Sequence, residues 1–177
     1  VKLMSKIPKI IHFCWFGGNE LDKKSKLCID SWKKNLPDYE IKMWNESNYD
    51  INKHPFLKEA YENKKWAFVS DYARLDIIYS YGGIYLDTDV EVLKSFDSLL
   101  DYECFMGIED GSLCVATGLG FGAVAHNDFI KENLVMYDNL KLFDENTGKM
   151  NPLNCPIITT NLLKKYGYNS LNVNQII

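Results

Sequence analysis

Two aspartates separated by one residue follow a short apolar stretch and are well suited to bind a metal ion. Asp87 and Asp89 flank Thr88 and come after Ile-Tyr-Leu at 84–86. Side chains alternate along a strand, so Tyr85, Asp87 and Asp89 share one face if the strand continues. Two neighbouring carboxylates repel each other, and Mg²⁺ or Mn²⁺ is a suitable counter-charge for oxygen ligands. A solvated turn, in which Asp and Thr are common, is the alternative.

A second charged group precedes these aspartates by about one helix. Asp71 and Arg74 are three residues apart beside Ser70, and such positions share one face of a helix. The surrounding segment is strongly apolar, which favours a pair that faces a cleft. There Arg74 could bind a phosphate or hydroxyl, and Asp71 could accept hydrogen bonds from sugar hydroxyls. Replacing Arg74 with alanine should then weaken donor binding and leave the melting temperature nearly unchanged. An ordinary surface ion pair, worth under about 1 kcal/mol, is the alternative.

Apolar patterning predicts the elements that must position these groups. A nearly continuous apolar run over 7–16 predicts a buried strand, which Gly17-Gly18 would end. Helical spacing predicts a helix over 22–35, and alternation predicts a strand over 39–44. The side chains expected on the inner side of that helix are Leu27, Trp32 and Leu36. A strand, a helix and a strand in this order predict a parallel sheet.

The remaining patterns complete one α/β domain over residues 1–177, without repeats or linkers. Helices are expected at 55–63, 65–81, 128–140 and 157–166, strands at 84–86, 104–108 and 119–124, and extended chain at 90–93. Gly82-Gly83 would end the second of these helices, either as a simple C-cap or by letting the backbone approach a ligand. The glycines of 118–122 lack the context of a dinucleotide-binding loop and could let a strand pass close to a sugar.

Composition limits the possible functions. The chain has 177 residues, 46% of them apolar and 14% aromatic, with a net charge of −4. Its Lys and Arg residues are dispersed, which argues against a nucleic-acid partner. The odd number of cysteines, five, shows no C-x-x-C spacing and predicts buried free thiols in a reducing compartment. The three histidines show no metal-ligand spacing with them, so zinc is not expected and His12, His54 and His126 should be structural or surface residues.

Targeting signals are not apparent. Residues 1–6 lack the apolar region of a signal peptide, and no stretch of 18 apolar residues occurs. We therefore expect a cytoplasmic protein, with peripheral contact at the inner face of the membrane as an open alternative. The sequence does not indicate an oligomeric state.

Two separated motifs resemble glycosyltransferase family thirty-two, the transferases with a DxD-containing sugar-binding region. One is 7–18, Ile-Pro-Lys-Ile-Ile-His-Phe-x-Trp-Phe-Gly-Gly. The other joins Ser-Asp-x-x-Arg at 70–74 to Tyr-Gly-Gly-Ile-Tyr-x-Asp-x-Asp at 81–89. The resemblance covers about 7–125 and extends to fungal mannosyltransferases, bacterial capsule and lipooligosaccharide enzymes, and the glucosyltransferase domains of large clostridial cytotoxins.

The resemblance implies a GT-A fold, the Rossmann-like fold of nucleotide-diphospho-sugar transferases, with a mixed, mostly parallel sheet flanked by helices. It also implies a hexosyltransferase that uses Mn²⁺ or Mg²⁺ and a nucleotide-sugar donor. The sequence does not identify the base, and UDP is our first choice with GDP second. The acceptor would be a carbohydrate, a polysaccharide such as capsule, or a glycolipid. Transfer is expected to retain the anomeric configuration.

The resemblance also assigns roles to individual residues. Trp15 would stack on the nucleobase, although a core position for this ring is equally open. Asp71 and Arg74 would contact the donor sugar, and Asp87, with them, completes the candidate catalytic set. Asp87 and Asp89 are the candidate metal residues, with Asp89 the direct ligand. The candidate donor-binding residues are Trp15, Phe16, Ser70, Asp71, Arg74, Tyr85, Asp87 and Thr88.

Two alternatives remain open. A phosphatase of the haloacid dehalogenase type also places D-x-D after an apolar strand, but its motif normally opens the chain. A nucleotide-sugar or glycan-binding module without catalysis is the other. Relatives continue past the position of Ile177 with His and Ser-Trp residues that close over the diphosphate, so we expect a domain truncated at its C-terminus.

Overall fold

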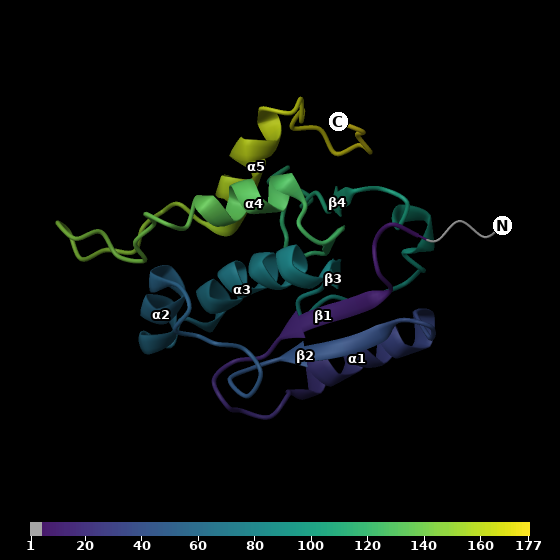
Figure 1. Ribbon diagram of the computed structural model, residues 1–177, viewed down its shortest axis with the longest axis horizontal. Coiled ribbons are helices and arrows are strands. Elements are labelled where there is room, and N and C mark those ends of the chain that lie inside the picture. The colour runs from purple at the N-terminus through teal and green to yellow at the C-terminus, as the bar shows by residue number, and fades with distance from the viewer. Residues whose placement is uncertain (1–4) are drawn as a thin grey trace.

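The computed structural model describes residues 5–177 as a five-stranded sheet in the order β2-β1-β3-β5-β4, with helices on both faces (Figure 1). The strands are β1 Ile10–Cys14, β2 Glu40–Trp44, β3 Gly83–Tyr85, β4 Cys104–Met106 and β5 Phe121–Ala123. Strand β1 is parallel to β2 and β3, whereas β5 is antiparallel to β3 and β4. Four of these five strands therefore run in one direction, which confirms the predicted mixed, mostly parallel sheet.

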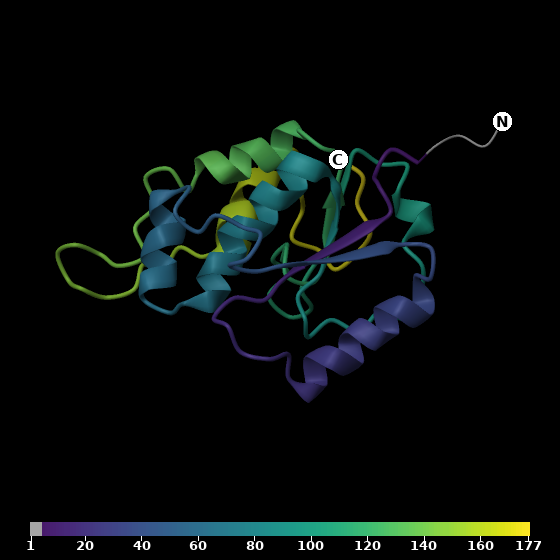
Figure 2. The same ribbon diagram turned by 60° about the horizontal axis from the view of Figure 1, so that its bottom comes forward.

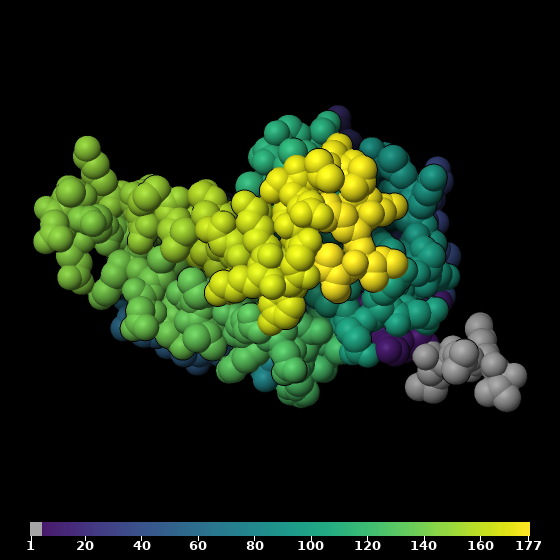
Figure 3. Space-filling model, turned by 90° about the horizontal axis from the view of Figure 1, so that it is seen from above, coloured from purple at the N-terminus to yellow at the C-terminus, as the bar shows by residue number. Residues whose placement is uncertain are grey.

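The helices form a layer on each side of the sheet. They are α1 Lys23–Asn35, α2 Pro55–Glu62, α3 Trp66–Tyr81, α4 Asp128–Val135 and α5 Cys155–Lys164, with a short 3-10 helix η1 at Asp97–Leu99. Helix α1 covers one face, and α3 lies on the other beside α2 and α4 (Figure 2). The connection between α4 and α5 projects from one end of the molecule, and α5 and the C-terminal segment lie together over the top (Figure 3).

The alternation of strand β1 divides the core in two. Ile11 and Phe13 point toward α1, where the Phe13 ring meets Trp32 edge to face at 5.5 Å. Cys14 points to the other side and joins the core beneath α3. His12 also faces that side, where its Nε2 donates a hydrogen bond to Gly82 O (2.9 Å). A strand buried on both faces is thus confirmed, but it spans Ile10–Cys14 and ends before Gly17-Gly18.

Helix α1 buries a different stripe from the predicted one. Trp32 is fully buried as expected, but Leu27 is 61% exposed. The buried positions on the helix are Ser25, Cys28, Ile29 and Trp32. These follow the spacing of three and four residues that defines one helical face, and Leu27 lies about 100° away from Cys28. The assignment of Leu27 to the core was therefore wrong.

Helix α5 begins earlier than predicted, at Cys155 instead of residue 157. The Asn154 side chain accepts a hydrogen bond from Ile157 N (3.2 Å), and a proline occupies the first turn. Both features are strong helix-start signals, because they satisfy or remove amide groups that lack partners inside the helix.

The strand before the paired aspartates does not continue to Asp89, as a shared face with Tyr85 would require. Strand β3 ends at Tyr85, and a turn follows in which Val90 N donates to Asp87 O (3.1 Å). Asp89 lies in this turn and is exposed, so it does not continue the strand face of Tyr85. The segment 90–93, predicted as extended, also pairs with no strand in the part of the chain described.

The glycine pair between α3 and β3 serves the fold. Gly82 caps the helix with a positive φ of 67°, and its amide donates to Ile78 O (2.8 Å). A Cβ on Gly83 would lie 2.8 Å from Ile10 O, so only glycine lets β3 approach β1 here. The C-cap interpretation is confirmed, and the close backbone approach is to β1.

The other sequence expectations concern cysteines, histidines and the membrane. All five cysteines are free; three are buried, and burial raises the pKa of Cys14 to about 12. His12 is structural: it accepts a hydrogen bond from Trp44 Nε1 (3.0 Å), and burial lowers its pKa to about 4. Across residues 5–177, none of the helices is both long and apolar enough to cross a bilayer. Of residues 1–6, examined above for a signal peptide, 1–4 lie outside the described residues.

Candidate active site

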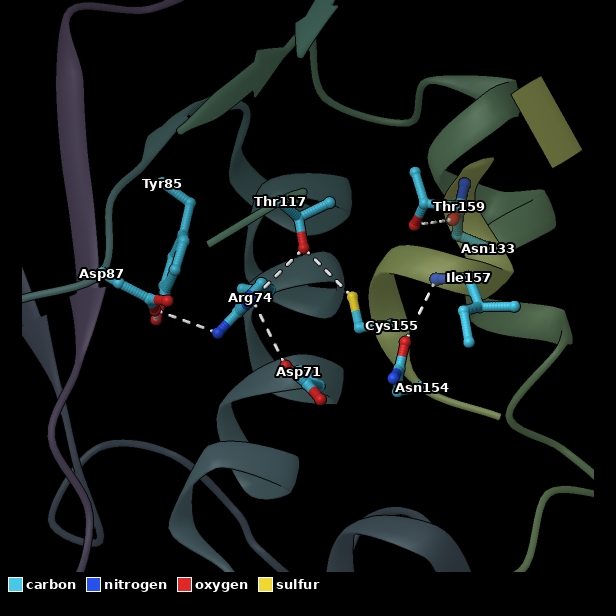
Figure 4. Close-up of polar contacts among 10 residues, drawn as sticks. All are labelled: Asp71, Arg74, Tyr85, Asp87, Thr117, Asn133, Asn154, Cys155, Ile157 and Thr159. Carbon is cyan, nitrogen blue, oxygen red and sulfur yellow. Dashed lines mark hydrogen bonds and ion pairs between the residues drawn. The ribbon is translucent and has the colours of Figure 1, made fainter. Parts of the chain in front are cut away.

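Arg74 connects the two charged groups that the sequence singled out (Figure 4). Its guanidinium lies 3.3 Å from Asp71 Oδ1 on the same helix and donates from NH2 to Asp87 Oδ1 at 3.0 Å. The Arg74 side chain is only 7% exposed. The surface ion-pair interpretation is therefore wrong, and α3 and the end of β3 together hold a three-residue charged cluster, Asp71–Arg74–Asp87.

The Asp87 carboxylate is fixed from more than one side. The Tyr85 hydroxyl donates to the same Oδ1 at 3.0 Å, and Arg74 lies over the Tyr85 ring, 5.0 Å from its centroid. The Asp87 amide donates to Gly118 O at 3.2 Å. The Asp87 side chain is nevertheless 34% exposed, so the carboxylate is oriented by the protein and still open to a ligand.

The segment before β5 completes the cluster. Arg74 NH1 donates to Thr117 Oγ1 at 3.3 Å, and Thr117 in turn contacts Cys155 Sγ at 3.1 Å (Figure 4). Next in the chain, Gly118 leaves no room for a side chain, because a Cβ there would lie 2.3 Å from Asp87 Oδ2. Helix α5 anchors this segment, since Val115 N donates to Thr160 Oγ1 at 2.8 Å.

Sequence reasoning missed Thr117, Gly118 and Cys155 as neighbours of the cluster. The glycine run at 118–122 was the only signal, and it was attributed to close approach toward a sugar. In the structure, Gly118 instead makes room for the Asp87 carboxylate. Thr117 and Cys155 carry no local pattern that could have indicated their position.

The cluster sets the charge states of its members. Burial raises the pKa of Asp71 to about 6, against the opposing effect of Arg74, and the charge of Asp87 adds to the rise. Burial also raises the pKa of Asp87, while Arg74 and the Tyr85 hydroxyl counteract it. Burial disfavours the charge on Arg74, but the neighbouring acidic groups outweigh this effect and raise its pKa well above the ordinary value. Arg74 is therefore positively charged throughout the neutral range.

The raised pKa of Asp71 predicts a specific pH dependence of stability. The unfolded chain loses this proton near the ordinary value of 3.8, but the folded protein keeps it to about pH 6. Between these values the folded state binds more protons, so this group lowers the free energy of unfolding as pH rises, by up to about 3 kcal/mol. Urea denaturation of Asp71→Asn without nucleotide or metal should lack this contribution. Asp101→Asn, at an exposed position, should keep the wild-type slope, and an unchanged slope in Asp71→Asn would contradict the prediction.

Trp15 and Phe16, the aromatic residues predicted for the nucleotide pocket, pack in different halves of the core. Trp15 is half-buried just after β1, packs against the α1-side core, and donates from Nε1 to Asn19 O at 2.8 Å. Phe16 is buried in the α3-side core, with its ring 6.0 Å from that of Tyr49. Stacking of a base on Trp15 stays a prediction, as does a donor contact by Phe16, whose ring is enclosed by protein.

Of the other predicted residues, only Tyr85 has a hydrogen bond to the cluster among the described contacts. Ser70 and Thr88 are half-buried, and Asp89 is exposed. Tyr85 is 1% exposed, and its hydroxyl orients Asp87, a role that the sequence did not predict. Its predicted contact with the donor stays a prediction. Within residues 5–177, no group of three or more His, Cys, Asp or Glu side chains is placed to hold a metal ion by itself.

Comparisons with known proteins support the resemblance found in the sequence. The family described as "Glycosyltransferase sugar-binding region containing DXD motif" matches residues 22–106, which include all three members of the charged cluster and the D-x-D segment. Over these residues the chain is similar to that glycosyltransferase family. This similarity argues against the haloacid dehalogenase alternative, whose resemblance rested on the D-x-D alone.

Named relatives agree with the family. Inositol phosphoceramide mannosyltransferase 3 of Schizosaccharomyces pombe is 35% identical over 108 residues, which are 56% of this chain and 29% of that protein. A mannosyl phosphorylinositol ceramide synthase of Saccharomyces cerevisiae is 30% identical over 111 residues, 56% of this chain and 27% of that protein. The chain thus spans less than a third of the length of these curated relatives.

A solved structure confirms the fold. The PaToxG glycosyltransferase superposes with a TM-score of 0.68 over 91% of this chain and 69% of that one, at 22% identity. Together with the mixed sheet and its flanking helices, this similarity confirms the predicted GT-A fold.

Proposed function

We propose that this protein transfers a hexose from a nucleoside-diphosphate sugar to a hydroxyl group of a glycan or glycolipid, with retention at the anomeric carbon. The observation that carries the proposal is the cluster in which buried Arg74 bridges Asp71 and Asp87 at the carboxyl end of β3. Ligands of open α/β sheets bind at this edge. A fixed guanidinium and partly open carboxylates suit the phosphates and hydroxyls of such a donor.

The residues after β3 fit a metal ion that binds together with the donor. Mg²⁺ and Mn²⁺ commonly use one or two carboxylates plus substrate phosphates, so a complete protein cage is not required. Asp89 is exposed, and the Asp87 carboxylate is already engaged by Arg74 and Tyr85. This favours Asp89 as the direct ligand and Asp87 as an oriented neighbour. A bound cation would neutralise negative charge on the leaving diphosphate.

The names of similar proteins bear on the choice of donor and acceptor. UDP stays our first choice of nucleotide and GDP the second. The names of the fungal relatives speak for a mannosyl group and a ceramide-linked inositol phosphate acceptor in those proteins. This supports a glycolipid acceptor here over capsular polysaccharide. We also propose that a cytoplasmic protein would meet such an acceptor at the inner face of the membrane.

Donor hydrolysis tests the proposed function without knowledge of the acceptor. UDP- and GDP-hexoses are incubated with the protein and Mn²⁺ or Mg²⁺, and release of free UDP or GDP is measured by chromatography. We expect metal-dependent release from at least one donor. Binding without release would identify a non-catalytic nucleotide-sugar module, and neither binding nor release would refute the proposal.

Asp89→Ala is expected to remove metal-dependent donor binding. The side chain is exposed, so stability should change little, while the affinity for UDP in Mn²⁺ should fall at least about tenfold, a loss of roughly 1.4 kcal/mol. Calorimetric titration with and without Mn²⁺ measures the effect. Asp101→Ala removes another exposed carboxylate and should bind like the wild type. An unchanged affinity in Asp89→Ala would disprove the metal assignment.

A further inference from the structure

A separate cavity of about 220 Å³ lies between helix α3 and the loop that follows β2. The loop runs beside α3 in Figure 2. The lining combines aromatic rings with side chains that donate and accept hydrogen bonds, and it includes Trp44, Tyr49, Asp76, Ser80 and Tyr81. We call this cavity the α3 pocket. None of the candidate donor-site residues lines it.

The pocket has a rigid aromatic wall. Tyr81 is 54% exposed, and its ring stacks on that of Trp44 with centroids 5.4 Å apart. Lys42 Nζ lies 4.2 Å from the Trp44 ring centroid, and Tyr49 meets Trp44 edge to face at 6.3 Å. Contacts on several sides thus hold the rings in place. A preorganised ring with a large exposed area suits a ligand with a flat apolar face.

The polar wall is formed around Asp76. Its Oδ2 accepts from the Tyr49 hydroxyl at 2.7 Å and from Lys53 Nζ at 2.6 Å. Asp50 and Ser80, both exposed, also line the pocket. The lining therefore contains the carboxylates of Asp50 and Asp76 and the ammonium group of Lys53, which is paired with Asp76. The excess of negative charge disfavours an anionic ligand. A cationic ligand is also disfavoured at Asp76, because Lys53 already neutralises this carboxylate.

The α3 pocket lies on a different side of α3 from the charged cluster. Asp76 follows Arg74 by two residues, which places it about 200° around the helix. Arg74 accordingly faces Asp87 and Thr117, whereas Asp76 faces Tyr49 and Lys53. A ligand in the pocket would therefore not contact the residues that hold the donor.

Size and chemistry together define the ligand. Pockets for drug-sized molecules measure about 300–1,000 Å³, so a cavity of about 220 Å³ has room for one small ring and not for a nucleotide. We propose that the α3 pocket binds a single neutral monosaccharide unit, with the apolar face of the sugar on Tyr81 and its hydroxyls toward Asp76, Asp50 and Ser80.

This site gives the protein a second contact with a glycan. Its assignment to a sugar of the acceptor rests on the proposed function, whereas binding of a monosaccharide does not. An anchored sugar would raise the effective concentration of a linked acceptor hydroxyl near the reaction centre.

Saturation-transfer NMR with simple glycosides tests the site. The protein is mixed, without nucleotide or metal, with the methyl pyranosides of mannose, glucose, galactose and N-acetylglucosamine. We expect saturation transfer to at least one of them. Tyr81→Ala removes the aromatic wall and Ser80→Trp fills the cavity, and both positions are exposed, so the fold should tolerate the changes. Each variant should lower the transfer at least fivefold.

A control variant shows whether the loss of transfer is specific to the pocket. Tyr102→Ala removes another exposed tyrosine, 44% exposed, away from the pocket and should leave the transfer unchanged. Absence of transfer with all four glycosides, or transfer that survives both pocket variants, overturns the proposal. Since no donor or metal is present, this result is independent of the Asp89→Ala titration, and either proposal can fail without the other.

Discussion

Gly118→Ala should lower the turnover of the sugar donor by about 100-fold, the order expected when a group that positions the reactants is displaced by about 1 Å. The added methyl group would lie 2.3 Å from Asp87 Oδ2 and 3.2 Å from Arg74 NH1. A contact that short cannot persist, so the Asp87 carboxylate must move and its bond to Arg74 must lengthen. Gly118 does not have a positive φ angle, so alanine at this position introduces the clash without backbone strain.

The measurement is donor hydrolysis together with the melting temperature. Gly107→Ala is the matched control, because its Cβ would make only an ordinary contact of 3.4 Å with Leu119. This variant should keep most of the activity. Full activity in Gly118→Ala would show that the position of Asp87 does not limit turnover, whereas unfolding of that variant would show that the clash cannot be absorbed locally.

The parallel half of the sheet could be predicted because its signals are local. The apolar run over 7–16, the helix that follows and the alternation over 39–44 each carry their own period, and a strand–helix–strand order permits essentially one pairing. The placement of β5 between β3 and β4 had no such signal, because antiparallel pairing with β3 is decided by packing between distant segments. The error at Leu27 has a related cause: a lone leucine does not reveal which face of a helix is buried.

The candidate site also contains residues whose placement the sequence could predict and residues whose placement it could not. Helical spacing predicted that Asp71 and Arg74 share one face of a helix, and the family resemblance grouped Asp87 with them. The turn after Tyr85 could not be predicted, because Asp-Thr-Asp suits a strand end and a turn equally well. Thr117 contacts Arg74 across 43 residues, and only the packing of α5 against the segment before β5 determines that contact.

Burial of Arg74 reverses the effect on stability that its spacing suggested. The sequence favoured a residue whose loss would leave the melting temperature nearly unchanged. With its side chain 7% exposed between two carboxylates, Arg74→Ala should instead destabilise the protein by about 3–5 kcal/mol, because removal of one partner leaves buried charge uncompensated. For a chain of this size the melting temperature should fall by roughly 6–20 °C. Lys58→Ala breaks an exposed pair with Glu62 on α2 and should cost under about 1 kcal/mol.

A second substitution separates charge compensation from lost packing. If the penalty in Arg74→Ala comes from repulsion between Asp71 and Asp87, then Asp87→Asn in the same chain should restore part of the stability. Lowering the pH should have the same effect, because Asp71 then takes up a proton. Without the opposing charge of Arg74 the pKa of Asp71 rises further, so this uptake begins above pH 6. Urea denaturation of the single and double variants at alkaline and acidic pH measures this coupling. Strictly additive losses would assign the effect to the missing side-chain volume of Arg74 and would remove the argument that this residue is held in place by its two carboxylates.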